Sequence, residues 1–148
     1  MHRLERTQEI PRPINEVFSF FGDASNLEAI TPPFLKFKIL TPLPIDMSKG
    51  ARIEYSLSLF GFPIRWKTLI SEWNVNTSFV DEQVSGPYAT WIHRHEFEAT
   101  ENGTLMRDIV DYEEPFGVIG QIAHKLFIQH TLNRIFDYRS SAIHKLIG

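Results

Sequence analysis

The stretch that decides the fold spans residues 79–113 and reads FVDEQVSGPYATWIHRHEFEATENGTLMRDIVDYE. It contains three runs rich in β-branched and aromatic residues, which favour strands. The predicted strands are Phe79–Ser85, Ala89–Ala99 and Thr104–Glu113. The turn formers Gly86-Pro87 and Asn102-Gly103 separate these runs. Because the connections are short, we expect the three strands to be antiparallel neighbours in one sheet.

The chain before this stretch adds four more strands and two short helices. The four strands are predicted at His2–Ile10, Phe34–Thr41, Arg52–Phe60 and Ile64–Val75. The spacing of apolar residues predicts one helix that starts at Pro13 and a second that starts near Asp23 and ends at Thr31. Beyond Pro115 the pattern is helical to the end of the chain. The sequence therefore predicts an α+β fold in which all 148 residues form one domain.

Composition and charge exclude several classes of function. The chain has no cysteine, which rules out disulfides, thiolate catalysis and cysteine-ligated zinc. Its 15 basic residues are interspersed with 18 acidic ones, and the net charge of -3 argues against nucleic-acid binding. No apolar run approaches the ~18 residues of a membrane span. The first residues, MHRLERTQEI, lack the apolar core of a signal peptide, so we expect a cytoplasmic protein without a cofactor.

The apolar side chains of the predicted C-terminal helix change sides halfway along it. In the first half they are Ile119, Ile122, Ala123, Leu126 and Phe127, and in the second half they are Leu132, Ile135, Phe136, Ile143 and Leu146. At about 100° per residue the two stripes lie on nearly opposite faces, so a straight helix cannot bury both against one sheet. We therefore predict a bend or break between Ile128 and Leu132. Otherwise the first half must face a cavity, a dimer partner or the N-terminal helices.

The order of elements resembles the helix-grip fold of the START/SRPBCC superfamily. The likeness is carried by GFPIRWKTLISEW (61–73), FVDEQVSGPYATWIHRHEFE (79–98), GTLMRDIVDYEEPFG (103–117) and IFDYR (135–139). It covers essentially the whole chain and is closest to small bacterial SRPBCC proteins of the cyclase/dehydrase-like or ligand-binding kind. This resemblance implies a sheet wrapped around the C-terminal helix, with a cavity between them. Relatives bind lipids, sterols, hormones or polyketides there, and some catalyse cyclisation or dehydration.

Strand alternation predicts which polar side chains face that cavity. In the segment 91–98 the odd positions lie opposite a charged set that belongs in water, so His93 and His95 are expected to point inward. The same parity turns another group inward: Trp66, Glu72, Asp81, Gln83, Trp91, Asp108 and Tyr112.

The turns also predict how these strands pair. They place His95 opposite Asp108 on one side and opposite Asp81 on the other, with Glu72 beyond Asp81. Arg139 belongs to the inward stripe of the final helix and is expected to hang over this row. The prediction thus gathers carboxylates, imidazoles and a guanidinium in one part of an aromatic interior.

Three interpretations of this cluster remain open. It is a structural network in which Arg139 and the histidines neutralise buried carboxylates, or it is the polar end of a pocket that orients a ligand's head group. In the third, His93, His95 or Asp108 is catalytic as a general acid or base. Two histidines with carboxylates are also a weak metal signal, and we predict no metal site.

The favoured hypothesis is a non-catalytic protein that binds a small hydrophobic or amphipathic molecule between the sheet and the C-terminal helix. Its predicted ligand-binding residues are Trp66, Glu72, Asp81, Gln83, Trp91, His93, His95, Asp108, Tyr112 and Arg139. One alternative is an enzyme of the cyclase or dehydratase type that uses the His/Asp cluster. Another is a homodimeric interaction protein whose contact face contains Ile119, Ile122 and Leu126.

Overall fold

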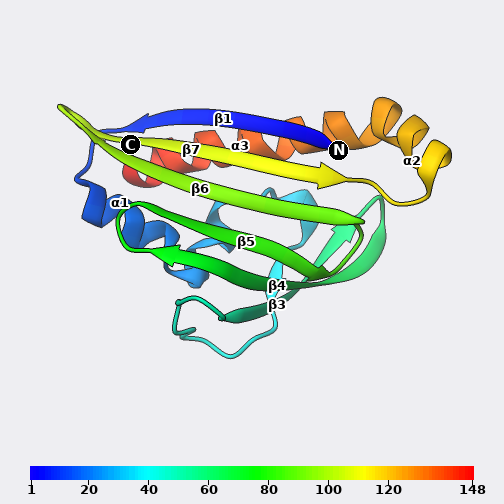
Figure 1. Ribbon diagram of the computed structural model, residues 1–148, viewed down its shortest axis with the longest axis horizontal. Helices are drawn as coiled ribbons and strands as arrows, with labels where there is room; N and C mark the ends of the chain where they lie inside the picture. Colours follow the sequence, from blue (N-terminus) through cyan, green and yellow to red (C-terminus); the bar gives the residue numbers. More distant parts are fainter.

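A seven-stranded sheet curves over a long C-terminal helix in the computed structural model, which describes residues 1–148 (Figure 1). The strands are β1 (His2–Ile10), β2 (Lys38–Ile39), β3 (Arg52–Leu59), β4 (Phe62–Asn74), β5 (Ser78–Ser85), β6 (Thr90–Thr100) and β7 (Gly103–Glu113). They pair in the order β1-β7-β6-β5-β4-β3-β2, and every neighbouring pair is antiparallel. The predicted α+β class is confirmed.

The segment after β1 begins with helix α1 (Ile14–Phe21) and continues as three 3₁₀ turns. These turns are Ala24–Asn26, Glu28–Ile30 and Pro33–Leu35, and the second short α-helix predicted for this region is wrong. The Asp23 carboxylate accepts hydrogen bonds from the backbone N–H and the hydroxyl of Ser25, and the Thr31 hydroxyl donates to the Leu27 carbonyl. Such local side-chain bonds compete with a continuous α-helix.

The C-terminal helix has an irregular turn within it. It comprises α2 (Gly117–Ala123), a π-helical turn at His124–Ile128 and α3 (Gln129–Ile147). The wider π turn changes which side of the helix faces the sheet, and it directly precedes the segment for which a break was predicted.

No helix has both the length and the apolar run that a membrane crossing requires.

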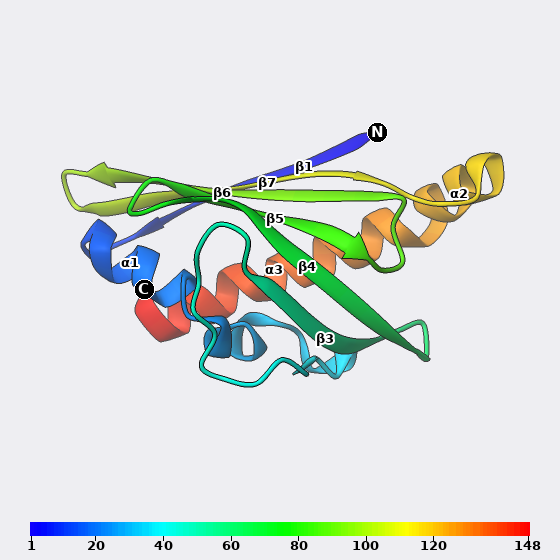
Figure 2. The same cartoon turned by 60° about the horizontal axis from the view of Figure 1, so that its bottom comes forward.

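The two halves of this helix bury different amounts of their apolar side chains. In α3, Leu132, Phe136 and Ile143 are buried, whereas Ile119 and Ile122 of α2 are exposed. Leu146 was predicted to belong to the buried stripe of the second half, and this prediction is wrong because Leu146 is 49% exposed. Figure 2 shows α3 beneath the sheet and α2 at the far end from α1. The exposed apolar face of α2 agrees with the prediction that the first half of the helix does not pack on the sheet. The homodimer that would cover this face stays a prediction.

The buried apolar residues form three clusters rather than one continuous core. The largest lies where α1 and the end of α3 meet the sheet, around Val17, Phe18 and Ile143. A second surrounds Val110 and Phe136, and a third joins Leu35, Leu57 and Trp66. The space between these clusters becomes the pocket described below.

Replacing Ile143 by alanine tests which face of α3 the sheet buries. Ile143 is 0% exposed and belongs to the largest cluster, so Ile143→Ala should lower the free energy of unfolding by about 2–5 kcal/mol. Leu146→Ala is the matched control and should change it by less than about 0.5 kcal/mol. Urea unfolding followed by tryptophan fluorescence measures both. Equal losses for the two variants would contradict this packing.

Candidate functional site

A pocket lies between the inner face of the sheet and α3. Its volume is about 180 Å³, and 19 of its 25 lining residues are hydrophobic. The lining includes Leu57, Trp66, Ile70, Phe79, Trp91, Leu132, Ile135 and Phe136. A cavity of roughly 150 Å³ already suffices for benzene. The space is therefore large enough for a small organic molecule, and its walls favour an apolar one.

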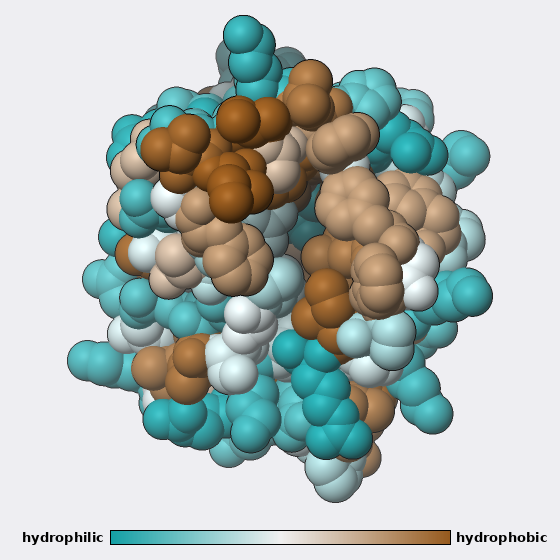
Figure 3. Space-filling model, turned by 90° about the vertical axis from the view of Figure 1, so that its right-hand side faces the viewer, coloured by the Kyte–Doolittle hydropathy of each residue, from teal (hydrophilic) through white to brown (hydrophobic).

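Hydrophobic side chains surround a hollow at the α2 end of the molecule (Figure 3). The exposed residues at this end come from the β3–β4 turn and from the segment that follows β7: Phe60, Phe62, Phe116, Val118, Ile119, Ile122, Leu126 and Phe127. The rings of Phe60 and Phe127 lie 6.4 Å apart between centroids, so the two segments meet. Leu59 lines the pocket and precedes Phe60 in the chain. The β3–β4 turn thus connects the lining of the pocket to this hydrophobic end of the molecule.

One part of the pocket is polar and combines residues of three strands and one helix. Asp81 comes from β5, His93 and His95 from β6, Asp108 from β7 and Arg139 from α3. All of them line the pocket except Asp108, which lies behind the histidines. We refer to these five residues as the polar cluster.

The Asp108 carboxylate is the centre of the polar cluster. Arg139 donates to it twice, from Nε and from Nη2, at 3.2 Å each. His93 Nε2 lies 2.8 Å from Asp108 Oδ1. Since a carboxylate only accepts hydrogen bonds, His93 carries a proton on Nε2. Its Nδ1 lies 3.7 Å from Asp81 Oδ2, which is too far for a hydrogen bond.

His95 is held on both sides. Its Nε2 lies 2.6 Å from Asp81 Oδ2 and therefore donates to that carboxylate. Its Nδ1 lies 3.5 Å from Arg139 Nη2, a guanidinium donor. The ring also stacks on His93 and on Phe79, with centroid distances of 3.7 and 4.0 Å. Both nitrogens of His95 are thus engaged by the protein itself.

Burial and neighbouring charges set the ionisation of the polar cluster. Burial, helped by the proximity of His93, lowers the pKa of His95 to about 4, so the ring is neutral at pH 7. Burial alone would raise the pKa of Asp108, but Arg139 and the histidines outweigh it and hold that pKa well below the usual range. Burial also acts to raise the pKa of Asp81, but the nearby His93 and His95 outweigh this effect and lower that pKa. Both aspartates are therefore carboxylates at neutral pH.

The structure brings most of the predicted inward residues together, and one register prediction is wrong. His95 pairs with Asp108 across β6 and β7 as predicted. On the other side it pairs with Phe79, and Asp81 lies opposite His93 instead. The hydrogen bond between Asp81 and His95 therefore runs diagonally across the two strands. Asp81 lies directly opposite His93, and a side chain can also reach the residue two positions further along the neighbouring strand.

Glu72 does not belong to the pocket, and its predicted inward position is wrong. A register shift between Ile70 and Glu72 marks a β-bulge in β4, which reverses the alternation of sides along the strand. Ile70 still points inward and is buried, whereas Glu72 is exposed and pairs with Arg94 at 3.0 Å. Strict period-two alternation does not reveal such a bulge.

Two further predicted residues stand beside the pocket rather than in its lining. Gln83 hydrogen-bonds to the backbone N–H and carbonyl of Tyr88 and so fixes the β5–β6 turn. Tyr112 is buried, and its hydroxyl lies 2.7 Å from His124 Nε2. The predicted residues Trp66 and Trp91 do line the pocket, with ring centroids 5.3 Å apart.

Sequence reasoning missed two polar features of the pocket, Tyr55 and the unpaired indole N–H of Trp66, whereas strand alternation does turn Thr68 inward. Tyr55 and Thr68 line it, with their oxygens 3.2 Å apart. Tyr55 lies on the same face of its strand as Ile53 and Leu57, because the three are spaced two residues apart, and the sequence offered that signal. The indole N–H of Trp66 is buried without an acceptor in the protein, which only the three-dimensional arrangement reveals.

Comparisons with known proteins bear on the fold. No protein-family model matches the sequence, and no curated protein matches it. Solved structures do match: a START superfamily protein from Mycobacterium smegmatis has 17% identity and a TM-score of 0.71 over 99% of both chains. The major latex-like protein 151 of Panax ginseng has 13% identity and a TM-score of 0.71 over 99% of this chain and 97% of its own. The chain has the START/SRPBCC fold.

A third solved structure is similar to this chain over nearly its whole length. The Thermus thermophilus protein TTHA0849 has 17% identity and a TM-score of 0.72, over 97% of this chain and 95% of its own. Identities this low establish the fold alone. The predicted resemblance to the START/SRPBCC superfamily is thus confirmed at the level of the helix-grip fold, and the function depends on the site.

The buried neutral state of His95 predicts a pH dependence of stability. Its pKa is about 4 in the folded protein, against an ordinary value of 6.5. Between these pH values the unfolded chain binds more protons than the folded one, so the free energy of unfolding should fall as the pH falls from about 6.5 to about 4. A shift of this size corresponds to about 3 kcal/mol.

Urea unfolding at several pH values measures this effect. His95→Gln should flatten the slope in that window, whereas His130→Gln, at an exposed position of α3, should leave it unchanged. An undiminished slope in His95→Gln would show that other groups cause the loss of stability.

Proposed function

We propose that this protein binds a small amphipathic molecule in the pocket between the sheet and α3. The observation that carries the proposal is the combination of a largely hydrophobic lining with one polar part, where His93, His95, Asp81 and Arg139 meet. Apolar walls with a few placed polar groups are the usual composition of a small-molecule site, because burial gives affinity and hydrogen bonds give orientation. The START/SRPBCC fold supports the same proposal.

The free hydrogen-bonding groups suggest what the ligand carries. Asp81 is the most exposed member of the polar cluster, with 17% of its side chain accessible, and its Oδ1 receives no hydrogen bond from the protein. As a carboxylate it favours a donor such as a hydroxyl or an amine. We therefore infer a ligand with an aromatic or alicyclic body and a hydrogen-bond donor that faces Asp81.

Filling the pocket tests the binding proposal. Ile135 lines the pocket from α3 and is half-buried, so Ile135→Trp should fill it. The dye anilinonaphthalenesulfonate, whose fluorescence rises in apolar surroundings, should bind the unaltered protein, and Ile135→Trp should weaken that binding roughly tenfold or more, the equivalent of about 1.4 kcal/mol.

Two further variants complete this experiment. Leu59→Trp blocks the same space from β3, whereas Val84→Trp adds the same side chain at a position of β5 that is 51% exposed. The first should reduce dye binding and the second should not. Native mass spectrometry of the unaltered protein also measures the mass of any molecule that co-purifies with it. Dye binding that survives both pocket variants would refute the proposal.

Acid–base catalysis is the second candidate function, and the geometry of His93 favours it. Asp108 fixes His93 through Nε2, while Nδ1 has no hydrogen-bond partner and the ring lines the pocket. A carboxylate that orients an imidazole whose other nitrogen is free is the arrangement of a general base. His95 is less suited to this role, since both its nitrogens are engaged.

Product analysis separates catalysis from binding. If His93 is a general base in a dehydratase-type reaction, the molecule identified by native mass spectrometry should lose the mass of one water on incubation with the protein. His93→Gln should abolish that loss and retain binding, whereas His130→Gln should retain both. A ligand recovered unchanged after long incubation with the unaltered protein would leave binding as the function.

A further inference from the structure

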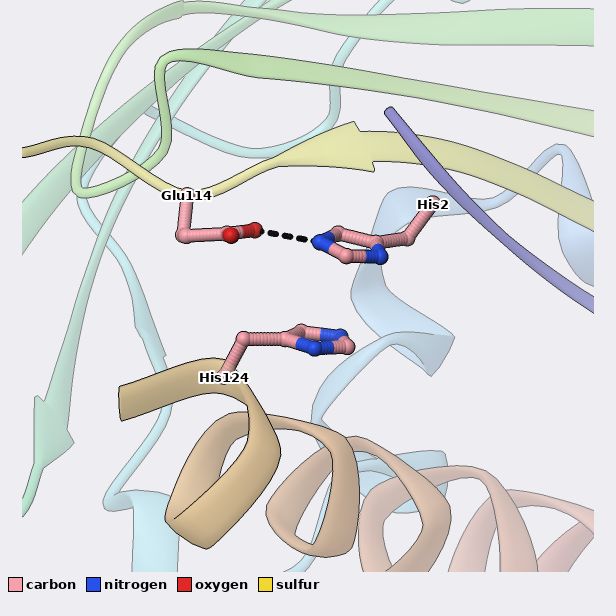
Figure 4. Close-up of side chains that lie close together, drawn as sticks. All are labelled: His2, Glu114 and His124. Atoms are coloured by element: carbon pink, nitrogen blue, oxygen red, sulfur yellow. Dashed lines mark ion pairs between the residues drawn. The ribbon is translucent and has the colours of Figure 1, made fainter. Parts of the chain in front are cut away.

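A second group of metal-ligating side chains lies outside the pocket. His2 at the start of β1, Glu114 just after β7 and His124 in the π turn offer ligand atoms that all lie within 4.8 Å of one another (Figure 4). His2 Nε2 lies 2.7 Å from Glu114 Oε2. The two imidazole rings stack, with centroids 3.6 Å apart and planes 7° from parallel. The β1–β7 register places His2 opposite Tyr112, two residues before Glu114, and the Tyr112 hydroxyl contacts His124.

The Glu114 carboxylate is poorly satisfied by the protein alone. Its side chain is only 4% exposed, and Oε2 receives no hydrogen bond of good geometry. A buried carboxylate oxygen in that state costs free energy unless a cation or a donor approaches it. The other two members of the group present only imidazole nitrogens to it, and no lysine or arginine pairs with Glu114. The nearest partner of this acid is thus the His2 imidazole, and no guanidinium or ammonium group neutralises it.

His124 is already oriented as metal-binding histidines are. Its Nε2 lies 2.7 Å from the Tyr112 hydroxyl, and both residues are buried. When Nε2–H donates to that oxygen, the lone pair of Nδ1 is free. In metal sites the second ring nitrogen of a ligating histidine almost always makes such an outer hydrogen bond, which fixes the tautomer and the ring orientation.

We propose that His2, Glu114 and His124 bind a Zn²⁺ ion. Two imidazoles and one carboxylate form a borderline donor set that suits zinc and related transition ions, whereas magnesium and calcium favour oxygen ligands alone. With metal–ligand bonds of about 2.0–2.2 Å, the three ligand atoms would move to about 3.3 Å apart, and water would complete the tetrahedron. Because each lone pair lies in its ring plane, binding turns one imidazole out of the stack.

The other His/carboxylate group of the molecule is a poorer metal site. Asp81, His93 and His95 also lie close enough to share an ion. There, however, Arg139 Nη2 lies 3.5 Å from His95 Nδ1, and a fixed guanidinium repels a second cation. Both nitrogens of His95 are also occupied. The charge distribution thus favours the outer group.

An ion at this position would join the first strand of the chain to two points of the segment that follows the last strand. His2 belongs to an edge strand, Glu114 directly follows the last strand, and His124 lies in the π turn between α2 and α3. Few other contacts restrain α2, whose apolar side chains are exposed at the pocket end. Zinc would therefore stabilise the attachment of α2 and raise the melting temperature.

Calorimetric titration and thermal melting of the full chain, without an affinity tag, test this proposal. After treatment with a chelator, the protein should bind one equivalent of Zn²⁺ and no Mg²⁺. At a zinc concentration about 100-fold above the Kd, the melting temperature should rise by roughly 5–10 °C. Co²⁺ should give the visible absorption of a four-coordinate ion.

Single substitutions locate the ion. His2→Gln, at a position with 32% of its side chain exposed, should abolish the zinc-dependent shift without unfolding the chain, and Glu114→Gln and His124→Gln should do the same. His130→Gln, at an exposed position of α3, should keep the shift. Loss of zinc binding in His93→Gln but not in His2→Gln would place the ion in the polar cluster and overturn the proposal, as would the absence of any shift in the unaltered protein.

Discussion

The buried carboxylate of Asp108 is the charge around which the interior is arranged. It is 3% exposed, and an isolated carboxylate at such a depth would be prohibitively unfavourable. Arg139 from α3 and His93 from β6 both donate to it. To make these bonds, the helix must lie at one height and one rotation over the sheet. The polar contact therefore fixes a geometry that the non-directional packing of Leu132, Phe136 and their neighbours leaves less defined.

The polar cluster divides into a deep part and a part next to the pocket. Asp108 lies deep, and Arg139 neutralises it from the pocket wall, which is the task of a structural network. Asp81 and Nδ1 of His93 lie towards the pocket and keep free hydrogen-bonding capacity. The structural interpretation and the ligand-orienting one are thus compatible, because different atoms of one cluster serve each. A molecule in the pocket would meet groups that are already held in place.

The sequence predicted the parts of the fold that follow from regular periodicity. Alternation in β6 and β7 placed His93, His95 and Asp108 on the inner face, and the short turns gave the pairing of His95 with Asp108. Two of the errors lie where the regular period is interrupted locally. The bulge beside Ile70 turns Glu72 outward, and a side-chain bond pattern around Asp23 replaces a helix with 3₁₀ turns. Composition and spacing do not record such local departures from the period.

The change of apolar face along the final helix shows a different limit. The sequence revealed that the stripes of Ile122 and Phe136 do not align, but it did not reveal that a π turn would be the means of separating them. Likewise, Trp66 was recognisable as an inward aromatic, whereas its unpaired N–H depends on what surrounds it in space. Periodicity specifies faces, and only the assembled structure shows which atoms on those faces lack partners.

The two edges of the sheet have a consequence for how the protein behaves at high concentration. An exposed strand edge offers free N–H and C=O groups to another chain and is a common start of aggregation. Here one edge, β2, is only two residues long, and the other, β1, carries alternating charged residues such as Arg3, Glu5 and Glu9. Neither presents a long apolar strand to a second molecule. The short edge strand and the charged edge strand therefore allow this open seven-stranded sheet to stay exposed at both edges without promoting fibrous assembly.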